Sequence, residues 1–237
     1  MKNTYEDEKR ADAYAKLEFP GTYFLAYRDL PEIISKHVQG KEAIDFGCGA
    51  GRSTRFLKQH GFHVIGVDIS NDMLKQAKAK DPGGDYRLIT EDGLGSFEAN
   101  RYDLILAAFP FDNVPTMEKK IQLFGEIQRV LRPNGIAINL VSSPEIYTHE
   151  FTSTSSKGFP ENRLAKTGDI VKVIVTDMED QRPFEDTFMT DESYRQVYKE
   201  AGLKPIAVYR PLGREEDRIQ WTNETTVPPW VIYVLGK

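Results

Sequence analysis

The sequence is poor in cysteine and in long apolar runs. It has a single cysteine, Cys48, so no internal disulfide can form, as is typical of proteins in a reducing compartment. The longest apolar runs, at 104–110 and 136–141, are far too short to span a bilayer. The opening stretch MKNTYEDEKR is charged where a secretory signal needs an apolar core. We therefore expect a cytoplasmic protein that makes no membrane contact.

An excess of positive charge is also lacking. The 237 residues include 31 basic and 36 acidic side chains, which gives a net charge of -5. This balance argues against general nucleic-acid binding, which usually leaves a basic footprint. The sequence shows no internal repeat, and we expect no metal site. With 40% hydrophobic and 28% charged residues, the composition is that of an ordinary globular domain.

From residue 41 onward, short apolar stretches alternate with helical patterns. The expected strands lie at 43–46, 64–67, 86–90, 102–108 and 136–141. The expected helices lie at 51–60 and 71–80, and a third begins at Pro115. Strands that alternate with helices in this way predict right-handed crossovers and a mainly parallel sheet.

After Ser142 this rhythm changes. Residues 142–168 are rich in Ser, Thr, Pro and Gly, and 170–176 and 184–189 resemble a separate strand pair. A helix at 191–201 and strands at 206–209 and 230–235 then resume the pattern. We therefore expect a single α/β domain with four parts: an N-terminal helical cap (1–39), a core (40–141), an inserted flap (142–189) and a C-terminal helix with strands (190–237).

The stretch AIDFGCGAGR, residues 43–52, places three glycines directly after the first expected strand. A glycine-rich turn at this position lets the backbone approach a ligand closely. The dinucleotide fingerprint G-x-G-x-x-G would need a third glycine where this chain has Arg52. Asp45 also precedes the loop, and its carboxylate suits an ammonium group better than a pyrophosphate. The pattern therefore disfavours a nicotinamide oxidoreductase.

The chain resembles the class I S-adenosylmethionine-dependent methyltransferases over about residues 40–141. The family's acidic-x-G-x-G-x-G signature matches 45–51, and "DISNDML" at 68–74 matches the corner after the second strand. "EDG" at 91–93 and "LRPNG" at 131–135 follow in the family's order. The resemblance implies a three-layer Rossmann-like fold. Its mostly parallel seven-stranded sheet would have the order 3-2-1-4-5-7-6, with the last strand antiparallel.

The resemblance also implies S-adenosyl-L-methionine as cofactor and S-adenosyl-L-homocysteine as product. In the family, the residue at Asp68 accepts hydrogen bonds from the ribose hydroxyls, those at Ile69 and Met73 flank the adenine, and that at Asp92 accepts from its amino group. The predicted cofactor-binding residues are Asp45, Gly47, Cys48, Gly49, Gly51, Asp68, Ile69, Met73, Glu91, Asp92, Gly93, Ala107, Ala108 and Phe109.

No sequence motif identifies a catalytic base. His149 is the candidate, because it follows the strand at 136–141 on the expected ligand edge; a solvated loop residue is the alternative. A base is needed only if the acceptor holds its proton at working pH. After the fourth strand the chain has Ala108-Phe109-Pro110-Phe111, without the polar side chain that amino-methylating enzymes of the family carry there. Methylation of nucleic-acid or glutamine amino groups is therefore disfavoured.

Aromatic and polar residues around this edge are candidates for an acceptor pocket, with plain packing or surface roles as alternatives. They are Tyr14, Tyr23, Phe111, Asp112, Tyr147, Arg210 and Trp221. The favoured function is methyl transfer to a small molecule by in-line displacement. A methyltransferase for a protein side chain or terminus, and a regulatory module that binds the cofactor without catalysis, remain alternatives. A monomer and a homodimer are both open.

Overall fold

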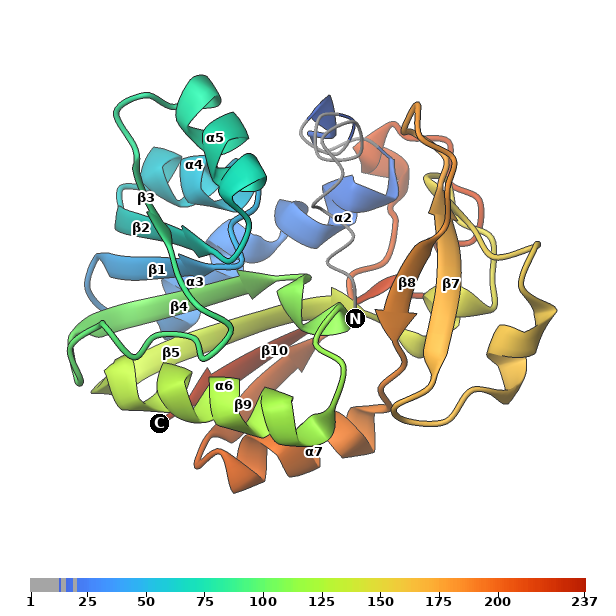
Figure 1. Ribbon diagram of the computed structural model, residues 1–237. Coiled ribbons are helices and arrows are strands. Elements are labelled where there is room, and N and C mark those ends of the chain that lie inside the picture. Colours follow the sequence, from blue (N-terminus) through green and yellow to red (C-terminus); the bar gives the residue numbers. More distant parts are fainter. Residues whose placement is uncertain (1–12, 14–15, 19–20) are drawn as a thin grey trace.

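The computed structural model describes residues 13, 16–18 and 21–237 (Figure 1). Its main sheet has seven strands in the order β3-β2-β1-β4-β5-β10-β9. The strands are β1 (Glu42–Phe46), β2 (His63–Asp68), β3 (Asp85–Leu88), β4 (Tyr102–Ala108), β5 (Leu131–Ser142), β9 (Lys204–Tyr209) and β10 (Trp230–Gly236). β10 runs antiparallel to both of its neighbours, whereas β1 to β5 pair in parallel. The predicted fold and strand order are confirmed.

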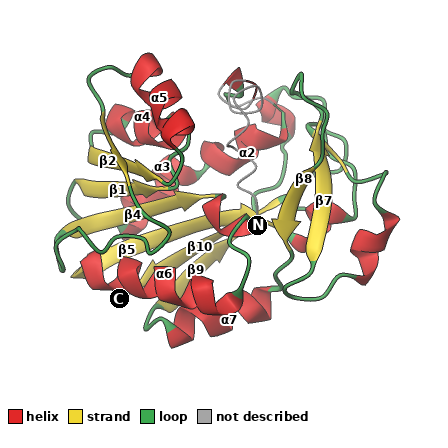
Figure 2. Cartoon of the chain, in the orientation of Figure 1, coloured by secondary structure: helices red, strands yellow, loops and turns green. Residues whose placement is uncertain are grey.

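Helices cover both faces of this sheet (Figure 2). They are α2 (Thr22–Arg28), α3 (Leu30–His37), α4 (Arg52–Gln59), α5 (Asn71–Lys80), α6 (Met117–Val130) and α7 (Asp191–Glu200). Successive strand side chains point to opposite faces. Ala43 and Leu104 pack in the cluster that includes α3 and α4, whereas Ile44 and Ile105 pack in the cluster that includes α6 and α7. The central strands are therefore apolar on both faces, as parallel strands usually are.

The ends of two helices show how local chemistry fixes their bounds. The Ser70 hydroxyl accepts a hydrogen bond from the Met73 N–H at 3.3 Å, so α5 begins where the sequence predicted. The start of α6 was predicted wrongly at Pro115. The Thr116 hydroxyl accepts from the Lys119 N–H at 3.1 Å, so Thr116 is the N-cap and the helix begins one residue later.

Two further boundaries differ from the predictions. β5 begins at Leu131 rather than at residue 136, because Leu131 already pairs with Tyr102 before the register with β4 shifts. Residues 8–38 were expected to form one or two helices with an interruption near residues 19–21. α2 begins at Thr22, directly after Gly21, and a further break at Asp29, which was not predicted, separates it from α3. A proline in the first turn of α3 suits that start, because its missing N–H would have no helical partner there.

Residues 142–189, here called the flap, form a second sheet. β6 (Thr154–Ser155), β7 (Ile170–Val175) and β8 (Phe184–Thr187) pair in antiparallel fashion in the order β6-β7-β8. The short 3-10 helices η3 (Pro144–Tyr147) and η4 (Pro160–Leu164) connect them to the rest. The predicted strand pair is thus confirmed. Figure 1 shows β7 and β8 beside the carboxyl ends of the parallel strands.

The ends and the starts of the parallel strands form two opposite edges of the main sheet. The carboxyl edge is where β1, β2, β4 and β5 end, and the amino edge is where they begin. In open parallel sheets, ligands bind beyond the carboxyl edge, near the point where strand order reverses. Here β1 lies between β2 and β4, so that point follows β1. Among the described helices, none is both long and apolar enough to cross a membrane.

Candidate cofactor and acceptor site

A cavity of about 550 Å³ lies at the carboxyl edge, between the glycine loop on one side and the flap on the other. This volume falls in the range of small-molecule sites. Nine predicted cofactor-binding residues contribute to its wall. They are Gly47, Gly49, Asp68, Ile69, Met73, Glu91, Gly93, Ala108 and Phe109.

The glycine loop contributes an unobstructed stretch of backbone. Gly49 has a φ of +51°, a left-handed conformation that favours glycine. A Cβ added there would meet only the Met73 methyl, at 3.0 Å, within 4 Å. Gly47 also has a positive φ, +71°, and packs against Pro110 so closely that a Cβ would collide with its ring. The loop therefore keeps side-chain volume away from this part of the cavity.

Asp68 is the carboxylate that ends β2 and lines the cavity. Its Oδ2 accepts a hydrogen bond from the Gly49 N–H and its Oδ1 from the Ser70 N–H, both at 2.8 Å. Burial raises the pKa of Asp68, and these N–H donors oppose that shift. Because each carboxylate oxygen can accept more than one hydrogen bond, both oxygens can still accept from a ligand.

The surroundings of Asp68 fit the nucleoside part of S-adenosylmethionine. A fixed carboxylate with remaining acceptor capacity suits two neighbouring ribose hydroxyls. Ile69, which is 47% exposed, and Met73 both line the cavity next to Asp68. They therefore offer apolar surface for the face of a base. The bare backbone at Gly49 leaves room beside them. Asp68, Ile69, Met73 and the loop would hold the cofactor here.

Asp45 lies in β1 beneath the glycine loop and does not reach the cavity wall. Its side chain is fully buried, and its Oδ2 accepts from the Ser53 and Thr54 hydroxyls at 2.7 and 2.6 Å. Its Oδ1 has no hydrogen-bond partner within the described part of the chain. Burial raises the pKa of Asp45 to about 6. We predicted that the Asp45 carboxylate would lie next to an ammonium group of the ligand. In this arrangement the carboxylate does not reach the cavity.

Four other predicted cofactor residues also lie outside the wall. Cys48 is buried against α5, and Gly51 precedes the first turn of α4 with a φ of +79°. The Asp92 side chain is 81% exposed and pairs with Lys119 at 3.3 Å. Ala107 points into the core beneath α6 and α7, the face opposite to that of the cap helices. For Cys48, Asp92 and Ala107 a neighbouring residue lines the cavity instead, whereas neither neighbour of Gly51 does.

Three aromatic rings form the wall near the cap. Tyr23 from α2, Phe109 after β4 and Trp230 at the start of β10 lie with ring centroids 4.8 to 5.9 Å apart. Phe109 has a φ of +72°, an uncommon conformation for a residue with a side chain. The Trp230 indole N–H donates to the Thr22 carbonyl at 2.8 Å and so anchors the ring. These rings give the cavity an aromatic side, although they are inclined to one another by 37° to 80°.

Of the predicted acceptor-pocket residues, Tyr23 and Asp112 line the cavity. Phe111 does not, because its ring stacks on Phe124 at 4.0 Å inside the core beneath α6. Tyr147 is buried behind the wall, where its hydroxyl donates to Asp186 at 3.1 Å.

Arg210 and Trp221 also lie elsewhere, and Tyr14 falls outside the described residues. Arg210 lines a separate, smaller cavity and bonds to Asp191 at 3.2 Å. The Trp221 indole donates to the Arg214 carbonyl at 3.3 Å on the surface. β9 ends at Tyr209 on the carboxyl edge, and the loop that follows it packs against α2 and the flap. There the buried Glu224 accepts from the Thr22 hydroxyl and the Thr152 N–H, both at 2.7 Å.

His149, the predicted base, is exposed and lies outside the cavity wall. Its Nδ1 is 3.0 Å from the Thr148 hydroxyl and 3.2 Å from the Glu145 carbonyl oxygen. Those neighbours are in the turn that ends η3, so the ring stabilises local loop structure. His149 is therefore a solvated loop residue, which was the alternative to a catalytic base.

The residues that the flap contributes to the wall were not predicted from the sequence. They are Ile146, Thr154, Val173, Val175, Phe184, Glu185 and Asp186. A signal for some of them was present, because buried residues alternate along β7 and begin β8. In β8 the buried positions include both Phe184 and Asp186. An acidic residue on the inward face of an amphipathic strand was the clue.

The inner end of the cavity holds a second group of titratable side chains. Asp112 is buried and accepts from the Ser142 N–H at 3.0 Å. Burial, together with the nearby Asp186, raises the pKa of Asp112 to about 7. Lys120 is also buried, and burial lowers its pKa to about 8. The described residues contain no group of three or more potential metal ligands.

A glycine loop at the switch point, a carboxylate ending the second strand and an antiparallel last strand define an α/β protein of the class I methyltransferase type. Residues 44–139 match the family model described as "Methyltransferase domain". Over residues 44–139 the chain is therefore similar to that family, and its fold is that of the class I S-adenosylmethionine-dependent methyltransferases.

Individual relatives are similar over part of the chain. A demethylmenaquinone methyltransferase of Staphylococcus saprophyticus is 33% identical over 109 residues, which are 44% of this chain and 46% of the relative. A cypemycin N-terminal methyltransferase of a Streptomyces species is 27% identical over 170 residues, 66% of this chain and 64% of the relative. The chain thus spans less than two thirds of both relatives.

The similarity in fold extends further than the similarity in sequence. The crystal structure of an S-adenosylmethionine-dependent methyltransferase from Clostridium acetobutylicum superposes with a TM-score of 0.64. The superposition covers 99% of both chains at 14% identity. At this identity the likeness concerns the fold alone.

Proposed function

We propose that this chain transfers a methyl group from S-adenosylmethionine to a small-molecule acceptor. One observation carries the proposal: Asp68 at the end of β2, the aromatic rings and the flap all line the same cavity. A cofactor held at Asp68 and an acceptor held beside Trp230 would thus share one space.

The cofactor would supply a methyl group on a positively charged sulfur. The chain's own contribution is to bind and orient. Asp68 would accept hydrogen bonds from the ribose hydroxyls, and Ile69 and Met73 would flank the base. The rings of Phe109 and Trp230 would orient a flat or apolar acceptor. Alignment of this kind can supply much of the acceleration of a displacement reaction.

The flap supports a small acceptor over a polymer. It contributes Val173 and Val175 from β7 and Phe184 from β8 to the same wall, opposite the glycine loop. A protein side chain or terminus would need an open groove. One relative is named for methylating demethylmenaquinone and another for methylating the N-terminus of cypemycin. A small acceptor and a peptide end are therefore the two outcomes to separate.

A labelling experiment separates them. The protein is incubated with S-adenosylmethionine carrying a ¹³C-methyl group and with a cell extract divided into a low-mass fraction and a protein fraction. We expect the label to enter the low-mass fraction, with formation of S-adenosylhomocysteine. Label confined to the protein fraction would favour the peptide acceptor instead.

The matched control is Gly49→Val, which places a side chain in the cofactor's space. This variant is expected to lose labelling of every fraction. Binding of S-adenosylhomocysteine by the unmodified protein without transfer to either fraction would instead favour a regulatory module that only binds the cofactor.

A further inference from the structure

Two carboxyl groups meet at the inner end of the cavity, from different parts of the chain. Asp112 follows β4, whereas Asp186 lies in β8 of the flap, and both line the cavity. The Asp112 carboxyl is oriented by the Ser142 N–H at 3.0 Å. The Asp186 carboxyl is oriented by the Asn113 amide at 2.7 Å and by the Tyr147 hydroxyl at 3.1 Å. Both groups are thus fixed in place by neighbouring hydrogen-bond donors.

A buried cation lies beside this pair. The Lys120 ammonium donates to the carbonyls of Phe111 and Val114, and its charge interacts with both carboxyls. Its positive charge disfavours a cationic acceptor in the same place, and the two carboxyls disfavour an anionic one. A neutral group that donates a hydrogen bond fits best.

A separate observation shows that a polar group further along the flap wall lacks a partner. Thr154 of β6 is 2% exposed and lines the cavity, yet its hydroxyl has no hydrogen-bond partner in the described part of the chain. Buried hydroxyls without a partner are rare because each costs free energy. Around it the wall is apolar, with Val173, Val175 and Phe184. The wall of the cavity is therefore mainly apolar, with a few polar groups that have hydrogen-bonding capacity left for a ligand.

We propose that the acceptor is a neutral, mainly apolar molecule with a hydroxyl group, and that Asp112 takes the proton of that hydroxyl during methyl transfer. This inference rests on the proposed function. In the step, the hydroxyl oxygen forms a bond to the methyl carbon while its O–H bond breaks. The proton passes to the Asp112 carboxylate. The electron pair of the broken carbon–sulfur bond stays on sulfur, which becomes neutral.

The protonation of Asp112 suits this role. Burial and the charge of Asp186 raise the pKa of Asp112 to about 7. Above that pH the carboxylate can accept a proton, and below it the group is already protonated. The other titratable groups whose charges act on Asp112 or respond to it come from α6, β8, η3 and α7. They are Lys120, Asp186, Tyr147, Tyr194 and Tyr198.

The test measures recognition of the hydroxyl in the protein loaded with S-adenosylhomocysteine. Three probes of similar size are titrated by calorimetry: 4-propylphenol, 4-propylanisole, whose oxygen carries no proton, and the anion 3-phenylpropanoate. At pH 8 we expect the phenol to bind at least tenfold more tightly than either other probe. This preference should fall to within about threefold at pH 6.

Asp112→Asn is the decisive variant, because its amide oxygen can still accept from the Ser142 N–H. It is expected to lose the preference for the phenol at pH 8 and to show no change between pH 8 and pH 6. Asp186→Asn is the matched control. It should keep the preference but lose it at a lower pH, because the neighbouring charge that raises the pKa of Asp112 is gone.

Several results would overturn the inference. They are equal binding of the phenol and the anisole, tighter binding of the anion, no binding of any probe, and a preference that survives in Asp112→Asn. Binding of S-adenosylhomocysteine itself, measured first, keeps the two proposals apart. If the unmodified protein fails to bind it, the proposed function fails and this inference fails with it. If it binds but the probe preferences are absent, only this inference fails.

Discussion

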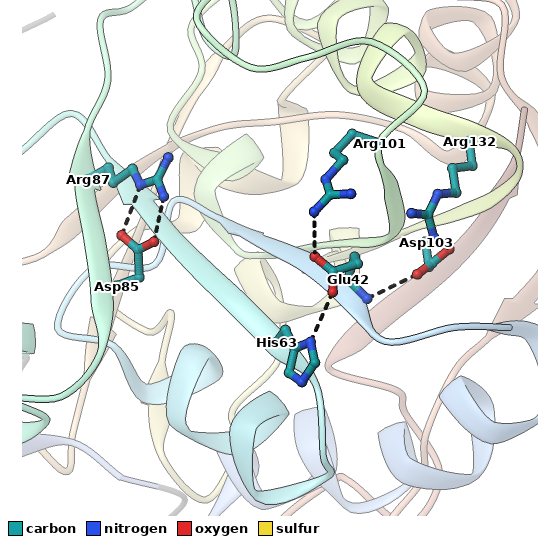
Figure 3. Close-up of polar contacts among 7 residues, drawn as sticks. All are labelled: Glu42, His63, Asp85, Arg87, Arg101, Asp103 and Arg132. Atoms are coloured by element: carbon teal, nitrogen blue, oxygen red, sulfur yellow. Dashed lines mark hydrogen bonds and ion pairs between the residues drawn. The ribbon is translucent and has the colours of Figure 1, made fainter.

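The two edges of the main sheet hold their charged groups in opposite ways. At the amino edge each carboxylate has a cationic neighbour (Figure 3). Glu42 contacts His63 at 2.9 Å and Arg101 at 3.4 Å, and Asp103 pairs with Arg132 while it accepts from the Glu42 N–H at 3.0 Å. These contacts join the starts of β1, β2, β4 and β5. They stabilise the sheet where no ligand is expected.

At the carboxyl edge, Asp45 and Asp68 are buried among neutral hydrogen-bond donors, whereas Asp112 lies near the buried Lys120. Burial raises the pKa of Asp45, Asp68 and Asp112, and it lowers that of Lys120. A protein that needed only stability would place a cation beside each carboxyl, or none of them in the interior. The difference indicates that the carboxyl edge keeps hydrogen-bonding capacity for ligands. Perturbed groups in a cavity are typical of functional sites.

The largest expected effect comes from filling the glycine loop. Gly49→Val should weaken binding of S-adenosylhomocysteine more than 100-fold, on the order of 3 kcal/mol, because the side chain would enter the cofactor's space. Calorimetry measures this affinity.

Gly61→Val is its control at the amino edge. Gly61 has a φ of +79°, so it shares the backbone strain, but its Cβ would meet only the Lys41 ammonium, at 4.0 Å. Both variants should lose at least about 1–2 kcal/mol of stability. An equal loss of affinity in both would break the contrast between the edges.

The next effect comes from removing one carboxylate at each edge. Asp68→Ala should weaken binding of S-adenosylhomocysteine by about 1–3 kcal/mol, because its hydrogen bonds to the ribose would be lost. Asp103→Ala removes a buried carboxylate from the amino edge instead, so it should lower stability and leave affinity unchanged. Calorimetry on both folded variants decides the point; an unchanged affinity in Asp68→Ala removes that residue from the site.

The pH dependence of stability offers a third contrast. Because burial raises the pKa of Asp45 to about 6, the folded protein binds more protons than the unfolded chain between about pH 4 and 6. The free energy of unfolding therefore falls as pH rises through this window. In Asp45→Asn this contribution disappears, and the decline should shrink by about 3 kcal/mol. Urea unfolding at several pH values measures it.

Asp81→Asn is the control for this experiment. Its carboxylate, near the amino edge, has its pKa lowered by a hydrogen bond from Lys58. A lowered pKa affects stability only below about pH 4. The decline between pH 4 and 6 should therefore persist in this variant. If Asp45→Asn declines as steeply as the unmodified protein, Asp45 is not held in the way described.

The smallest effect is expected from the exposed ion pairs. Glu42→Gln removes the charge that contacts His63 and Arg101, whose side chains are 79% and 50% exposed. Exposed pairs contribute at most about 1 kcal/mol, so stability should change by less than that and affinity should not change. Thermal unfolding checks the first and calorimetry the second. A loss of affinity here would mean that the two edges are coupled.

The sequence predicted most of what is local. The glycine loop, the Ser70 cap and Asp68 at the end of β2 each follow from a short stretch whose geometry is set by its own residues. The strand order is less local, but the alternation of strands and helices together with the family resemblance was sufficient for it.

What could not be predicted depends on contacts between distant segments. Asp186 and Thr154 reach the cavity only because the flap folds back over the carboxyl edge, where the Asn113 amide donates to Asp186 at 2.7 Å. The alternation of buried residues along β7 marks an inward face, but it does not indicate what that face packs against. The aromatic residues show the same limit. Phe109 and Phe111 lie two positions apart after β4, yet only Phe109, with its positive φ, faces the cavity while Phe111 packs in the core.

The most direct test of the whole account is a calorimetric titration of the unmodified protein with S-adenosylhomocysteine, and in parallel with NAD⁺. We expect one saturable site for S-adenosylhomocysteine and no measurable binding of NAD⁺ at the same concentrations. Binding of NAD⁺ alone, or of neither ligand, would contradict the claim that the carboxyl edge is built around the nucleoside of S-adenosylmethionine.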